Sequence, residues 1–283
     1  MSATSSSTSS SEPPAAGLGW PRFLRRAALL AALLPALFLA LLVVVDPYDS
    51  GRLSPFPLAG APTIGPRLAH ASRGRDPGFD AAIIGNSHMQ LISPARLDAA
   101  TGLRFVSLTV QGSGVREQAA LLGWFLRHRP SPPAAIVVGV DTMTCATGAA
   151  PMQSHPFPFW LYEESTLGYL GGLFRSDSAE HALLRIRARL NGGPFGRADG
   201  YEDYEQGWRG RWSAGDAIPG SGPLADGPGP FPGVAALSAA LRALPDSTAV
   251  VLVVPPVFAP LLPPPGSAAA RNGTACLDAL RAA

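Results

Sequence analysis

The chain has 283 residues, of which 47% are hydrophobic and 15% are charged, and its formal net charge is +2. This length is typical of one large domain or two small ones, and the apolar content is ample for a core. Nucleic-acid-binding proteins usually carry a strongly basic surface, and a net charge this small does not indicate one, so we expect no nucleic-acid partner.

The N-terminal region predicts a membrane anchor. Residues 1–20 are mostly Ser, Thr, Ala and Pro, too polar to fold, so a disordered tail is expected over residues 1–26. Residues 27–45 carry no charge, and about 20 apolar residues suffice to span a bilayer as a helix. Arginines before this run and Asp46 after it predict a cytoplasmic N-terminus and an extracytoplasmic remainder. A cleaved signal peptide is the alternative, although its apolar core is usually only about 7–15 residues long.

Residues 46–79 connect the anchor to the first strand. This stretch is rich in Pro and Gly, residues that punctuate regular structure. We therefore expect an extended extracytoplasmic stalk.

The remaining residues, 80–283, predict an α/β domain. Strands are expected at residues 81–84, 104–110, 134–140 and 248–254, and helices at residues 94–100, 115–128, 179–190, 234–244 and 268–282. Strands separated by helices indicate βαβ units and a parallel sheet with helices on both faces. Residues 142–177 are less regular, and residues 191–233 carry an aromatic stretch that either packs on its own domain or lines a sugar site: Tyr201, Tyr204, Trp208 and Trp212.

A small polar cluster follows the first strand of this domain. The apolar run stops at Gly85, which permits a tight exit, and Asn86, Ser87 and His88 come next. In an open parallel sheet, ligands bind beyond the carboxyl ends of the strands, so Ser87 is expected where a substrate is handled. The alternative is that Asn86 or Ser87 merely caps a helix.

The order of these motifs resembles the SGNH (GDSL-like) hydrolase superfamily, in particular its membrane-anchored bacterial branch related to polysaccharide O-acyltransferases. The resemblance covers residues 80–141 and implies a flavodoxin-like three-layer fold. It implies that Ser87 is the nucleophile of a G-x-S motif with Asn86 as a site residue. It also implies that Gly112, after the second strand, donates a backbone N–H to the oxyanion, and that Asp141 is a site residue after the third strand.

Two features depart from the pattern of this superfamily. Asp141 stands where the family has an asparagine, and an ionised carboxylate there repels an oxyanion unless burial protonates it. The family takes its base from a C-terminal Asp-x-x-His motif, which this sequence lacks. The alternative bases are His155 and His88, and the domain is expected to be either incomplete at its C-terminus or no longer catalytic.

The sequence therefore predicts a bacterial inner-membrane protein with a periplasmic esterase or O-acyltransferase domain, acting on a cell-envelope glycan or a small ester. The alternative is an inactive or truncated SGNH-like envelope protein that serves as a binding or assembly module. No cofactor and no metal site are expected, and the oligomeric state stays open. Cys145 and Cys276 either form a disulfide, as an oxidising compartment permits, or remain two buried thiols.

Overall fold

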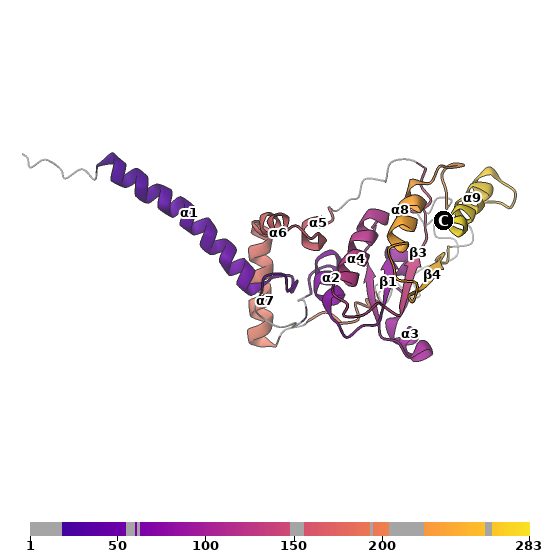
Figure 1. Cartoon of the computed structure of the whole chain (residues 1–283), viewed down its shortest axis with the longest axis horizontal. Helices are drawn as coiled ribbons and strands as arrows, with labels where there is room; N and C mark the ends of the chain where they lie inside the picture. Colours follow the sequence, from indigo (N-terminus) through magenta and orange to yellow (C-terminus); the bar gives the residue numbers. More distant parts are fainter. Residues whose placement is uncertain are drawn as a thin grey trace, which may run out of the picture. The chain divides into compact units, whose positions relative to one another are not determined.

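The computed structural model describes residues 19–54, 60, 63–147, 156–192, 195–203, 224–257 and 262–283. The chain divides into two compact units, Met1–Leu41 and Leu42–Ala283, and each is described by itself (Figure 1). In the first unit, the described residues belong almost entirely to helix α1.

Helix α1, Trp20–Val45, contains the expected apolar run and begins earlier than expected. Its mean hydropathy is 3.0 over the most apolar window, and it is long and apolar enough to cross a membrane. Most of its side chains are exposed, with Leu42 as its buried residue. A helix that is apolar on all sides and exposed is typical of a membrane span.

The second unit is built on a four-stranded parallel sheet with the order β2-β1-β3-β4. The strands are β1, Ala81–Gly85; β2, Phe105–Thr109; β3, Ala135–Gly139; and β4, Ala249–Val253. All four strands were predicted from the sequence within about two residues, because short β-branched runs between turn residues are typical of parallel strands.

The helices expected from the sequence are present as α3, Pro94–Thr101; α4, Val115–Arg127; α7, Ser176–Asn191; α8, Pro232–Leu241; and α9, Ala268–Ala282. Two further short helices, α5, Phe159–Tyr162, and α6, Thr166–Leu173, lie in the segment that was expected to be irregular. The sequence therefore did not predict α5 and α6.

Helices cover both faces of the sheet at β1, β2 and β3, which are buried, whereas the edge strand β4 is largely exposed. One face packs Ile84, Leu108 and Val138 into a core with α4, α8 and α9. On the other face, Ile83 and Val137 pack against Met89 and against Leu97 of α3. This arrangement is consistent with three layers, and the expected parallel α/β architecture is confirmed.

The stalk expected over residues 46–79 is corrected by the structure. Helix α2, Pro66–Arg75, forms there and packs against β2 and α4, while Tyr48 and Asp49 are fully or almost fully buried. Pro66 occupies the first turn of α2, where a missing N–H costs nothing, so this proline starts a helix. The segment is thus part of the folded unit.

Candidate active site

Three loops leave the same edge of the sheet, because the strands are parallel. They follow the carboxyl ends of β1, β2 and β3 and carry Ser87, Gly112 and Asp141, respectively. From β1 the chain moves outward to β2 and then crosses to β3 on the other side of β1. Such a reversal is the switch point at which open α/β sheets bind ligands. The structure therefore brings the residues predicted from the sequence to one edge.

Asn86 and Ser87 form the exit from β1. A single 3₁₀ turn, η1, covers Ser87–Met89, and Asn86 is its N-cap, with Oδ1 accepting a hydrogen bond from the His88 N–H at 3.0 Å. The capping role considered for Asn86 is therefore confirmed. Ser87, which is half-buried, is the first residue of the turn.

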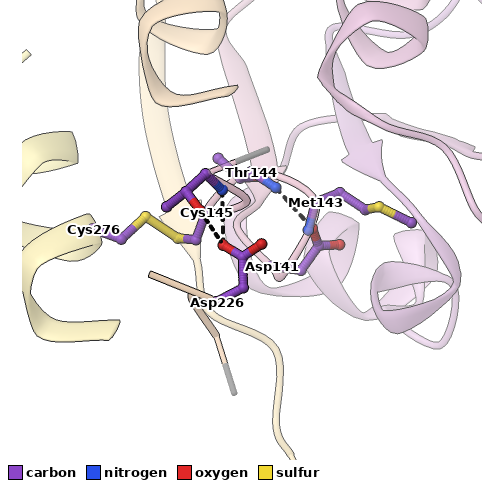
Figure 2. The surroundings of a disulfide bond; sticks show 7 residues. Asp141, Met143, Thr144, Cys145, Asp226 and Cys276 are labelled. Atoms are coloured by element: carbon purple, nitrogen blue, oxygen red, sulfur yellow. Dashed lines mark hydrogen bonds between the residues drawn. A yellow bond between two sulfur atoms is a disulfide. The ribbon is translucent and has the colours of Figure 1, made fainter. Parts of the chain in front are cut away.

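Asp141 connects this turn to the loop after β3. The residue is buried, and its carboxylate accepts a hydrogen bond from the Asn86 side-chain amide. Its other oxygen accepts hydrogen bonds from the backbone N–H groups of Met143 at 2.9 Å and Thr144 at 3.4 Å (Figure 2). These donors fix the carboxylate beside the exit from β1.

His88 lies against the same carboxylate, with 3.9 Å between His88 Nδ1 and Asp141 Oδ2. The neighbouring Asp141 carboxylate raises the pKa of His88 above its ordinary value, and partial burial opposes this rise. Because 3.9 Å is longer than a direct hydrogen bond, charge carries the interaction in this geometry. The two residues form an acid–base pair, and His88 directly follows Ser87 in the chain.

The loop after β2 is tied to the exit from β1. The carbonyl oxygen of Gly85 accepts hydrogen bonds from the Val110 N–H at 2.9 Å and the Ser113 hydroxyl at 3.2 Å. Between them, Gly112 has φ of +65°, a left-handed conformation that favours glycine. Gly112 is exposed in this turn, where its backbone is accessible to a ligand.

Gly85 has a different role from the one that the sequence indicated. Its φ is not positive, so a tight exit does not require glycine there. A Cβ at Gly85 or at Gly139 would overlap the side chain of Met89, which is fully buried across the ends of β1 and β3. Glycines at both strand ends allow this close packing.

His70 is a further histidine beside the site. The sequence analysis gave it no role, because residues 46–79 were expected to form a stalk. His70 Nε2 lies 2.8 Å from the carbonyl oxygen of Thr109, the last residue of β2, and Nδ1 lies 3.3 Å from Arg73 Nη1. Complete burial lowers the pKa of His70 to about 3. A neutral imidazole with both nitrogens engaged supports the fold and is unsuited to act as a base.

Two of the sequence predictions fall outside the described residues. His155, a candidate base, is one of them. So is most of the aromatic stretch, of which the structure describes Tyr201 alone. Within the described part of the chain, no group of three or more His, Cys, Asp or Glu side chains is arranged to hold a metal ion.

Cys145 and Cys276 form a disulfide, so the alternative of two buried thiols is wrong. The bond links the loop after β3 to helix α9 (Figure 2). Close by, both the N–H and the hydroxyl of Thr147 donate to Asp226 Oδ1 at 2.8 Å. The loop that carries Asp141 is thus held both by the sheet and by the C-terminal helix.

The fold and this site define an α/β domain with a serine, a histidine and an aspartate at the switch point of a parallel sheet. No protein-family model matches the chain, and neither a curated protein nor a solved structure matches it. The resemblance to SGNH hydrolases therefore rests on the motifs around Ser87, Gly112 and Asp141.

Proposed function

We propose that this protein is a membrane-anchored SGNH-like enzyme that hydrolyses or transfers an acyl ester, with Ser87 as the nucleophile. The observation that carries the proposal is the Asp141–His88 pair beside Ser87 at the switch point of the sheet. A serine needs a neighbouring base to become a nucleophile, and that base is usually oriented by a third group. His88 is assigned as the base because it is the described histidine that contacts Asp141.

The proposed reaction proceeds through an acyl-enzyme. Ser87 Oγ attacks the carbonyl carbon of the ester while its proton passes to His88, and Asp141 stabilises the imidazolium. The intermediate collapses by breaking the bond to the alcohol, which leaves with the proton from His88. Water or a glycan hydroxyl then attacks the acyl group on Ser87, and His88 takes the proton of that second nucleophile. The bond between the acyl carbon and Ser87 Oγ breaks, and His88 returns the proton to Ser87, which releases the acid or the new ester.

The negative charge of the tetrahedral intermediate requires preorganised donors. The backbone N–H groups of Ser87 and Gly112 are assigned to this oxyanion hole, since Gly112 lacks a side chain that would block the approach of a substrate. The hydrogen bonds from Val110 and Ser113 to Gly85 support the assignment, because they keep the two loops together.

An extracytoplasmic location at the bacterial inner membrane belongs to the same proposal. Helix α1 is a candidate membrane span: its first turns carry Arg22, Arg25 and Arg26 ahead of the apolar run, and Asp46 follows the helix. The Cys145–Cys276 disulfide supports an oxidising compartment for the folded unit. A domain held beside the membrane favours an ester of the cell envelope as substrate.

A fluorophosphonate probe tests the nucleophile. We expect the detergent-solubilised chain to be labelled covalently and Ser87→Ala to lose the labelling, because the probe reacts with activated serines. Ser93→Ala is the matched control, since Ser93 precedes α3 and makes no side-chain capping bond there. Labelling that persists in a folded Ser87→Ala variant would contradict the assignment.

The pH dependence of labelling tests the base. The neutral form of His88 is the active form, so the rate is expected to rise with pH around a midpoint above the ordinary imidazole value of 6.5. Asp141→Asn removes the charge that raises this pKa, and the midpoint should move to lower pH. Histidine NMR titrations of both proteins would measure the pKa of His88 directly.

Asp80→Asn is the matched control for that experiment. Asp80 lies at the amino end of β1, away from the site, and accepts a hydrogen bond from the Arg104 N–H. The same charge change there should leave the midpoint unchanged. An Asp141→Asn variant whose His88 titrates as in the wild type would show that the two residues are not coupled.

A binding or assembly module is the second candidate function, and the carboxylate of Asp141 favours it. SGNH enzymes have an asparagine at this position. The buried carboxylate of Asp141, when ionised, would repel the oxyanion instead of donating a hydrogen bond to it. A folded wild-type protein that no fluorophosphonate labels would select this function over the enzyme.

A further inference from the structure

A cavity opens in the folded unit at the end of the apolar helix. Its volume is about 310 Å³, and its walls are Val44, Val45, Arg185, Ile186 and Arg189. The two valines end helix α1, and they belong to the folded unit, which begins at Leu42. The other three residues belong to α7. The cavity thus combines apolar walls with two arginines of one helix.

Arg185 has unused hydrogen-bonding capacity in this cavity. Its side chain is 3% exposed, and Nη2 pairs with Asp49 Oδ1 at 2.6 Å. Its Nη1 is buried, and no described residue accepts a hydrogen bond from it. Burying a guanidinium N–H without an acceptor is unfavourable. An anionic oxygen in the cavity would accept this hydrogen bond and stabilise the buried guanidinium.

The charge balance around Arg185 also favours an anion. Asp49 is shared with Arg75, whose Nη2 lies 2.8 Å from the same oxygen, so one carboxylate serves two guanidinium groups. Arg189 follows Arg185 by one helical turn and is exposed. Residues four apart lie on the same face of a helix, so a second cation flanks the cavity.

The surroundings of the cavity are typical of a bilayer surface. Val45 ends the apolar run, and Asp46 is the first charged residue after it. If α1 spans the membrane, residues 44–46 therefore lie at the membrane–water boundary. Helix α7, which lines the cavity, exposes large apolar side chains beside its arginines: Leu183, Leu184, Ile186 and Leu190. Helices with exposed apolar and basic residues lie in the interface of a membrane.

We propose that this cavity binds the phosphate group of an anionic membrane lipid. Arg185 Nη1 and the guanidinium of Arg189 donate to the phosphate oxygens, a geometry for which guanidinium groups are well suited. Val44, Val45 and Ile186 contact the glycerol and the upper acyl chain. The apolar walls select a lipid over a free phosphate ion. The proposal requires α1 to span the membrane and does not depend on the enzymatic activity.

Native mass spectrometry of the detergent-solubilised full chain tests the site. Phosphatidylglycerol, phosphatidylcholine and inorganic phosphate are added in separate experiments. We expect one phosphatidylglycerol to be retained more strongly than phosphatidylcholine, and inorganic phosphate not to displace it. Arg189→Gln should weaken retention about tenfold, the effect of losing a charge-assisted hydrogen bond.

Arg187→Gln is the matched control, because Arg187 is exposed on the same helix and does not line the cavity. Ile186→Trp fills the cavity while both arginines remain, and it should also weaken retention. Equal retention by the wild type, Arg189→Gln and Ile186→Trp would overturn the proposal. So would an equal loss in Arg187→Gln, which would indicate unspecific attraction, or displacement by inorganic phosphate, which would indicate a site for a free anion.

Discussion

Asp49→Ala is expected to destabilise the folded unit by about 3–5 kcal/mol, because it removes the acceptor for buried positive charge. Asp49 is fully buried and accepts hydrogen bonds from Arg185 at 2.6 Å, Ser72 at 2.7 Å and Arg75 at 2.8 Å. Without this carboxylate, the guanidinium of Arg185 would be left in the interior with no counter-charge. Denaturant or thermal unfolding of the detergent-solubilised chain measures the loss.

The same carboxylate makes stability dependent on pH. Burial alone would raise the pKa of Asp49, but hydrogen bonds from Arg185 and Ser72 and the guanidinium charges hold it below its ordinary value of 3.8. A carboxyl group whose pKa is lower in the folded than in the unfolded state stabilises the folded state. The contribution is complete above the unfolded-state pKa and is lost as the pH falls towards the folded-state pKa. The wild type should lose this part of its stability below about pH 4, and Asp49→Ala should lack it.

Asp278→Ala is the matched control for Asp49→Ala. Asp278 pairs with Arg281 on the exposed face of α9, with side-chain exposures of 62% and 72%. Ion pairs that are this exposed contribute about 0–1 kcal/mol. Equal stability losses in Asp49→Ala and Asp278→Ala would contradict the role assigned to the buried cluster.

Loss of the disulfide is expected to have an effect of similar size. Cys145 and Cys276 are 131 residues apart and both fully buried. Closing so long a loop restricts the unfolded chain, and removing such a disulfide typically costs about 2–5 kcal/mol. The double variant Cys145→Ala, Cys276→Ala should therefore unfold at a lower temperature than the wild type, as differential scanning calorimetry would show.

Reduction of the wild type provides the control for this prediction. Dithiothreitol should lower the unfolding temperature of the wild type to near that of the double variant and leave the double variant unchanged. If the wild type unfolds at the same temperature with and without reductant, although the thiols are shown to be free, the disulfide does not stabilise this fold. Under the proposed function, reduction should also slow fluorophosphonate labelling, because the loop that carries Asp141 loses its connection to α9.

Local patterns explain most of the elements that were predicted correctly. The strand at residues 81–84 and the helix at 115–128 have the periodicities of buried strands and amphipathic helices, and these depend on neighbours within a few residues. The prolines of residues 46–79 were misleading, because Pro66 starts α2. Helices as short as α5 form through tertiary packing, which no local pattern reveals.

The sequence by itself determined the apolar N-terminal helix, the parallel α/β architecture and the common edge that carries Ser87, Gly112 and Asp141. These follow from hydrophobic length and from strand direction, which are encoded locally. Only the tertiary structure decided that His88 contacts Asp141, that Cys145 pairs with Cys276, and that Arg185 is buried against Asp49. Each of these contacts joins residues more than 50 positions apart, and such pairs meet only when sheet and helices pack.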